Sequence, residues 1–107
     1  MSQPIELFAD YEQIIDYYTI VGEWEIWLQH AKLGKSRVAI RIKQDRSGQY
    51  FHDVSHFYQP GKQSAPDVLE QPGQHSPEAA IRHAMNQLLT HYRADDADAE
   101  WIVNENY

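Results

Sequence analysis

The sequence predicts an α+β fold, in which a three- or four-stranded antiparallel sheet has two helices packed on one of its faces. Near each end of the chain, residues 7–18 and 81–92 carry apolar residues at the three-to-four spacing of a one-sided helix. Residues 24–43 between them alternate apolar and polar side chains, as half-buried strands do. Short links between the strands favour an antiparallel meander, so the predicted order is α-β-β-β-α.

The first predicted helix covers Leu7 to Tyr18. Its apolar residues fall at positions 7, 8, 11, 14, 15 and 18, and the polar residues Glu12, Gln13 and Asp16 take the other side. Gly22 is expected to end this segment or to turn the chain.

The first two strands are expected to put different side chains on their two faces. In the first, Trp24, Ile26 and Leu28 face one way and Trp27 faces the other. A loop over residues 32–36 leads to the second strand. Its inward residues are Val38, Ile40 and Ile42, and its outward residues are Arg37, Ala39, Arg41 and Lys43.

The third strand is predicted over residues 50–58, which are rich in aromatic and β-branched side chains, after a turn at residues 45–48. Residues 59–76 then form a long loop with two Pro-Gly pairs, a sequence typical of type II turns. Loops of this length are usually functional or mobile.

Ser76 and Pro77 suit the N-cap and the first position of the last helix. Its apolar stripe is Ile81, Ala84, Met85, Leu88, Leu89 and Tyr92. Residues 1–93 therefore form one predicted domain, and residues 94–107 form an acidic tail. The Trp101-Ile102-Val103 segment of the tail either docks on the domain, adds an extra strand, or is offered to a basic groove on a partner.

The α-β-β-β-α order resembles the double-stranded-RNA-binding fold. That family places a lysine-rich segment at the start of its second helix, where lysines meet phosphates. Here the corresponding residues are Ser76, Pro77, Glu78 and Ala79, so the resemblance is one of topology and implies no RNA-binding residues.

Composition predicts a soluble cytoplasmic protein. The apolar share of 42% and the aromatic share of 12% are those of a folded globule. The chain has no cysteine, which excludes disulfides and thiolate chemistry and fits a reducing compartment. The first ten residues are acidic where a secretory signal would be basic, and no apolar run approaches the ~20 residues of a membrane span.

Charge is sorted along the chain, whose net charge is −7. Residues 1–31 hold six acids and no Lys or Arg, whereas residues 32–46 hold six of the nine basic residues and one acid. Residues 94–107 hold five acids and no base. Such a dipolar surface affects partners and association rates rather than the fold.

Two histidine patterns in the sequence look like metal sites at first. His52 and His56 would lie roughly 13 Å apart on a strand, at ~3.3 Å per residue, whereas zinc needs each ligand nitrogen within about 2.1 Å. His83, Gln87 and His91 line one side of the last helix, but the glutamate of the H-E-x-x-H motif is missing. We expect this second set to be a solvent-facing polar stripe, and we expect no metal and no cofactor.

The sequence also indicates that the protein is not an enzyme. No G-x-S-x-G, P-loop or dinucleotide-binding motif is present, and the serines suit turns, strands and caps. Three tail carboxylates, at positions 95, 96 and 98, lie where catalytic geometry could not be held.

The strongest candidate site is therefore a partner-binding face on the open side of the sheet. Its predicted residues are Trp27, Arg37, Arg41 and Lys43, flanked by Lys32 and Lys35 in the adjoining loop. A basic face that carries an aromatic ring also suits single-stranded nucleic acid, although an acidic protein repels polyanions at long range. Alternatively, these cations neutralise the acidic helix or tail of the same molecule, or simply solvate an open sheet face.

The leading prediction is a small non-catalytic adaptor, regulator or inhibitor of a larger protein assembly, which uses this open face and the 59–76 loop. One alternative is a single-stranded nucleic-acid-binding module that uses residues 37–43. The other is an acidic, phage-type inhibitor whose surface imitates nucleic-acid phosphates.

Overall fold

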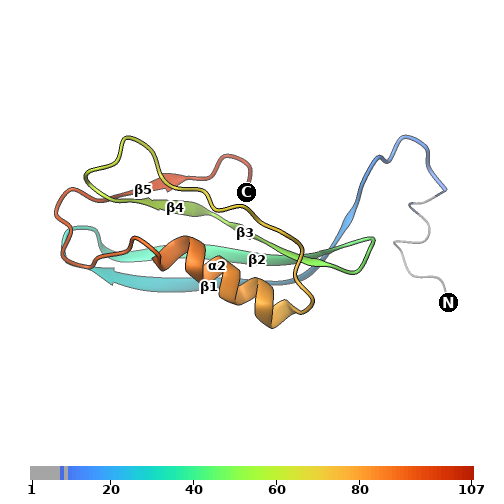
Figure 1. Cartoon of the computed structure of the whole chain (residues 1–107), viewed down its shortest axis with the longest axis horizontal. Helices are drawn as coiled ribbons and strands as arrows, with labels where there is room; N and C mark the ends of the chain where they lie inside the picture. The colour runs from blue at the N-terminus through green and yellow to red at the C-terminus, as the bar shows by residue number, and fades with distance from the viewer. Residues whose placement is uncertain (1–7, 9) are drawn as a thin grey trace.

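The computed structural model describes residue 8 and residues 10–107, which form an α+β structure with two antiparallel sheets (Figure 1). The larger sheet has the strand order β1-β2-β3, with β1 at Tyr18–His30, β2 at Gly34–Asp45 and β3 at Tyr50–Val54. The smaller sheet pairs β4, His56–Gln59, with β5, Glu100–Val103. Residues 10–107 contain one helix, α2, at Pro77–Leu89.

The first helix predicted from the sequence is wrong over residues 10–17, which form turns and extended chain. The amides of Tyr11 and Ile14 bond to carbonyls three residues earlier rather than four. Ile15 is 89% exposed and Tyr11 is 59% exposed, so these two residues of the predicted apolar stripe are not buried against the domain. Leu7 and Ala9 lie outside the described residues.

β1 and β2 form a long hairpin that begins earlier than the sequence indicated. Gly22, expected to end a helix, lies inside β1 beside a register irregularity between Ile20 and Gly22. The hairpin turn relies on Gly34, whose φ of +69° suits glycine. β2 therefore starts inside the loop predicted over residues 32–36.

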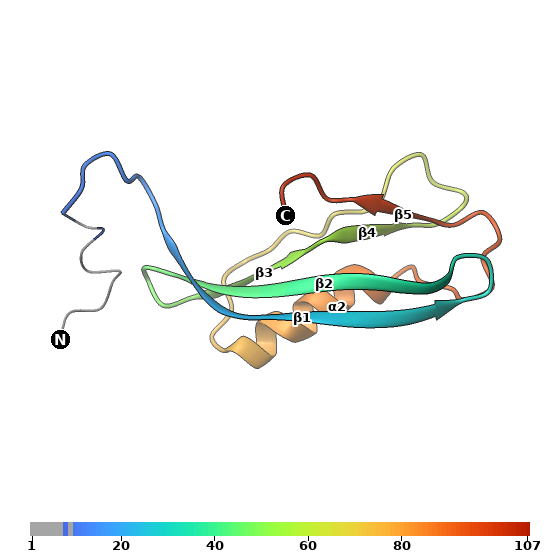
Figure 2. The same ribbon diagram turned by 180° about the vertical axis from the view of Figure 1, so that it is seen from behind.

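α2 forms as its N-terminal sequence predicted and supplies one side of the core. The Ser76 hydroxyl accepts a hydrogen bond from the Ala79 amide at 3.1 Å, and Pro77 occupies the first turn. The helix packs on β2 and β3, with β1 beside them in the sheet (Figure 2). The buried core residues are Val38, Ile40, Ile42, Val54, Ala80, Ala84 and Leu88.

The strand predicted over residues 50–58 is divided at Ser55. The Ser55 amide donates to the Ala39 carbonyl, and the Ser55 hydroxyl accepts from the Ala39 amide at 2.8 Å. Beyond this point the chain leaves β2 and pairs with β5 instead. The Trp101-Ile102-Val103 segment thus forms a strand, but in a second sheet.

Aromatic side chains pack together where β4 and β5 lie beside the segment that follows α2. The Tyr58 ring lies 5.0 Å from the Tyr92 ring and 5.2 Å from the Trp101 ring. The Tyr58 hydroxyl donates to the Arg93 carbonyl and contacts the buried His30 ring nitrogen. None of the helices in the described part of the chain is long and apolar enough to cross a membrane.

Candidate functional site

The predicted partner-binding residues Trp27, Arg37, Arg41 and Lys43 lie on one face of the three-stranded sheet, here called the outer face. Trp27 is directly opposite Arg37 in the β1–β2 register. The alternate residues Val38, Ile40 and Ile42 are buried against α2, so the outer face is the side away from the helix. Figure 2 views the sheet with α2 behind it.

Each cation predicted on β2 is paired with a carboxylate of the same sheet. Arg37 lies 3.3 Å from Glu25, Arg41 lies 3.0 Å from Glu23, and Lys43 lies 3.3 Å from Asp53. Arg41 also reaches Asp53 at 3.8 Å. These three cations and three carboxylates make the centre of the outer face electrically neutral.

The predicted site did not include the carboxylates Glu23, Glu25 and Asp53. Two of them could have been assigned to it from the sequence. Residues two apart on a strand share a face, which places Glu23 and Glu25 beside Trp27. Asp53 could not be assigned in the same way, because its position opposite Arg41 depends on the register between β2 and β3.

The last residue of the chain covers the middle of the outer face. The Tyr107 hydroxyl donates to the Glu23 carboxylate at 2.5 Å, and the Arg41 guanidinium lies 4.2 Å from the centre of the Tyr107 ring. Burial, together with the neighbouring Glu23, raises the pKa of Tyr107 to about 12. The hydrogen bond from Tyr107 lowers the pKa of Glu23, and the hydrogen bond and charge of Arg41 lower it further, against an opposing effect of burial.

The opposite end of the outer face remains open around Trp27, which is 61% exposed. A hollow of about 450 Å³ beside it is lined by Trp27, Leu28, Gln29 and Lys35. Arg37 is 61% exposed and faces Trp27 across the strand pair. We call Trp27, Lys35 and Arg37 the Trp27 patch.

The two lysines predicted in the flanking loop separate in the structure. Lys35 belongs to β2, directly opposite Gln29. Lys32 is exposed in the turn between β1 and β2. Arg41 and Lys43 lie farther along β2, and the Lys43 ammonium rests 4.4 Å from the Tyr18 ring.

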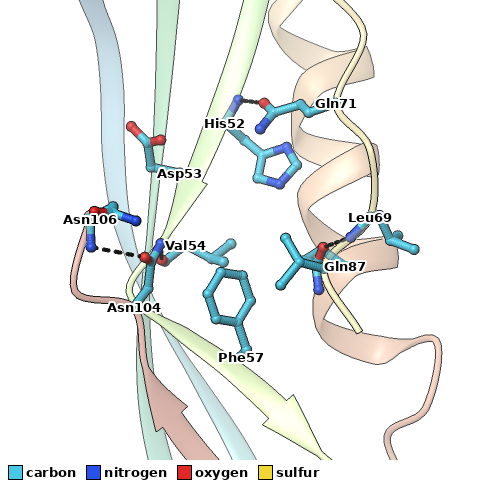
Figure 3. Close-up of a pocket in the computed structure, with 10 residues that line it drawn as sticks. His52, Asp53, Val54, Phe57, Leu69, Gln71, Gln87, Asn104 and Asn106 are labelled. Carbon is cyan, nitrogen blue, oxygen red and sulfur yellow. Dashed lines mark hydrogen bonds between the residues drawn. The ribbon is translucent and has the colours of Figure 1, made fainter. Parts of the chain in front are cut away.

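A second hollow, of about 200 Å³, lies between β3, α2 and residues 68–71 (Figure 3). The His52 ring points from β3 towards α2, and its centre is 5.2 Å from that of His83. Both Nδ1 atoms are buried without a hydrogen-bond partner in the structure. Burial, assisted by the charge on His83, lowers the pKa of His52 to about 4.

The polar stripe predicted to face solvent on the last helix instead holds the 59–76 loop. Gln87 is only 8% exposed, and its amide group accepts from the Leu69 amide and donates to the Asp67 carbonyl, each at 2.7 Å (Figure 3). His91 contacts the Asp67 carboxylate at 2.8 Å. The prediction failed because buried loop main chain needs polar partners, which this side of α2 supplies.

The histidine pattern of residues 52–56 does not bring the two rings to one site. His52 belongs to β3, whereas His56 belongs to β4 and its ring nitrogen contacts the Ser55 hydroxyl at 2.7 Å. Among residue 8 and residues 10–107, no group of three or more metal-ligating side chains is close enough to hold an ion.

Comparisons with protein-family models, with curated proteins and with solved structures found no match.

Proposed function

We propose that this protein is a small, non-catalytic, cytoplasmic binding protein that engages a protein partner through the outer face of its sheet. In this role it is an adaptor, regulator or inhibitor of a larger assembly. The observation that carries the proposal is the Trp27 patch, where an exposed indole lines an open hollow and the exposed Arg37 lies opposite it on β2. Trp and Arg dominate the energetic centres of protein interfaces.

Charge on the outer face favours a protein partner over nucleic acid. A polyanion is held by cations that are free to neutralise phosphates. On this face Arg37, Arg41 and Lys43 already have carboxylate partners, and the chain has a net charge of −7. A mixed surface of paired charges around an aromatic ring suits the charge complementarity of a protein interface.

Affinity capture with the full chain from its native host tests the proposal. We expect one stoichiometric protein partner, retained by wild type and lost in Trp27→Ser and in Arg37→Glu. Matched controls are Val103→Ser, since Val103 is 63% exposed on β5, and Arg82→Glu, on the helix side of the molecule. Capture of nothing specific, or equal capture by all variants, contradicts the proposal.

A labelled single-stranded oligonucleotide provides the competing measurement. Binding at low salt that weakens steeply with salt, and that is lost in the double variant Arg37→Glu/Arg41→Glu, would favour the nucleic-acid alternative. If the captured protein itself binds nucleic acid and is released by competing oligonucleotide, the acidic surface acts as a phosphate mimic.

A further inference from the structure

β1 is an edge strand of the three-stranded sheet, and among residues 10–107 only β2 pairs with it (Figure 2). Main-chain groups of successive residues in an antiparallel strand point alternately to its two sides. The Gln29 carbonyl accepts from the Tyr92 hydroxyl and the Ala31 amide donates to the Ala94 carbonyl, so odd-numbered residues point away from β2. Glu23, Glu25 and Trp27 therefore direct their amides and carbonyls to the open edge.

The two edge strands of this sheet differ in whether their outward-pointing main-chain groups have hydrogen-bond partners. At the β3 edge, Tyr50 exchanges two main-chain hydrogen bonds with Gln74, the His52 amide donates to the Gln71 side chain, and the Val54 carbonyl accepts from Asn104. Over residues 10–107, the corresponding contacts at the β1 edge occur only beyond Leu28. A long open edge is a template for pairing with another strand.

Exposed apolar side chains gather on both faces of β1. Trp24 on the inner face is 45% exposed, and Trp27 on the outer face is 61% exposed. α2 packs on β2 and β3, and a groove of about 240 Å³ remains between β1 and the helix. The groove is lined by Trp24, Ile26, Ile40, Ile81 and Met85.

We propose that a second copy of this chain occupies the edge, with residues 24–28 of the two copies paired antiparallel about a two-fold axis at Ile26. This register sets each Glu25 opposite Trp27 of the other copy. Both are outward-pointing residues, so the two pairs exchange four main-chain hydrogen bonds. The pairing merges the two sheets and extends the outer face across both copies, and it uses the strand edge rather than the face proposed to bind a partner.

Side-chain chemistry selects this register. It places Trp24 opposite Leu28 of the other copy, and Ile26 opposite Ile26, on the inner face beside the apolar groove. An axis at Trp24 would instead set Glu23 opposite Glu25, and an axis at Glu25 would set that residue opposite itself. Like charges directly opposite are destabilising. An axis at Trp27 would require the Gln29 carbonyl, which is occupied by Tyr92.

Part of the area that such an interface needs comes from Trp24 on the inner face. At about 250 Å² for a whole tryptophan, its exposed part is on the order of 110 Å² per copy, or about 220 Å² over both copies, against the ~1,000 Å² that a specific interface needs. The paired backbones, Ile26 and Leu28 add to this area. Because each copy carries a net charge of −7, we expect added salt to strengthen the dimer by screening repulsion.

Sedimentation of the full chain over a range of concentrations and salt tests the dimer. We expect a monomer–dimer equilibrium in wild type that shifts towards dimer with salt. Glu25→Pro removes an edge-facing donor from each copy without removing a bond to β2, so it should weaken dimerisation about 30-fold. Glu25→Ala, which keeps the amide, is the matched control and should dimerise as wild type does.

A second variant tests the inner face of the same pairing. Trp24→Lys should also disrupt the dimer, whereas Val103→Lys, at a residue 63% exposed on β5, should not. Each variant is used only if its urea midpoint shows that it is folded. A monomer at every concentration, or a dimer unaffected by both Glu25→Pro and Trp24→Lys, overturns the proposal.

The outcome is separable from that of the proposed function. A monomer that still captures a protein through the Trp27 patch refutes the dimer alone. Capture by a monomer that is lost in Glu25→Pro and kept in Glu25→Ala would assign the edge to a partner's strand instead of a second copy.

Discussion

Replacing His52 with leucine should make the protein less sensitive to acid. His52 is 5% exposed between β3 and α2, and burial lowers its pKa from the ordinary 6.5 to about 4. The charges on His83 and Lys43 contribute to this lowering of the pKa, whereas Asp53 opposes it. The fold therefore prefers the neutral ring, and the unfolded chain takes up a proton at a higher pH than the native state does.

The sign and size of the effect follow from these two pKa values. Stability from the neutral ring is fully present above pH 6.5 and is lost as pH falls towards 4, because the unfolded state then binds more protons. At 1.36 kcal/mol per pKa unit, the free energy of unfolding should fall by about 2.5 kcal/mol between pH 7 and pH 4.5 from this group alone. His52→Leu should lack this part of the decrease.

Urea unfolding followed by tryptophan fluorescence, at pH 7 and at pH 4.5, measures the difference between wild type and His52→Leu. Carboxylates such as Asp45 and Asp96, whose pKa values are lowered by hydrogen bonds, destabilise both proteins in acid and therefore cancel in the comparison. An equal loss of stability in the two proteins would refute the reasoning. So would a His52 ring that titrates near 6.5 in an NMR experiment.

Three further predictions concern the core, the loop and the C-terminus. Leu88→Ala removes a fully buried side chain and should cost about 3 kcal/mol in urea unfolding; a loss below about 1 kcal/mol would mean that the site collapses freely. Gln87→Leu leaves the Leu69 amide and Asp67 carbonyl without their partner, so stability should fall by about 1–3 kcal/mol and limited proteolysis within residues 60–75 should accelerate. Unchanged cleavage would show that the hydrogen bonds of Gln87 do not hold the loop in place. Tyr107→Phe removes a hydrogen bond that lowers the Glu23 pKa, so that pKa should rise in an NMR titration, and an unmoved value would exclude docking of Tyr107 in solution.

Local sequence determined the parts of the fold whose signals are local. Alternation of Val38, Ile40 and Ile42 with charged residues placed one face of β2 in the core and the other outside. Ser76 and Pro77 placed the start of α2, because a hydroxyl cap and a fixed φ suit a helix N-terminus. The turn at Asp45–Gly48 was also predicted from its local residues. It forms with a hydrogen bond from the Gly48 amide to the Asp45 carbonyl, and Gly48 has a φ of +92°.

Apolar periodicity predicted the wrong structure for residues 10–17, where residues of the predicted stripe such as Ile15 stay exposed. Apolar spacing over residues 7–18 suited a helix, but the chain over residues 10–17 forms turns and β1 begins at Tyr18. The division of the third predicted strand at Ser55 also could not be predicted from local sequence. It depends on a hydrogen-bonded contact with Ala39 and on β5, which comes more than forty residues later in the chain.

The sequence alone determined which residues of the candidate site share a face, because a strand alternates its side chains regardless of what surrounds it. Only tertiary structure decided what lies beside them: Asp53 against Lys43, Tyr107 over Arg41, and Gln87 beneath the 59–76 loop. These partners come from distant segments. Their positions depend on strand register and on the energy of burying polar groups with a partner, neither of which a local pattern encodes.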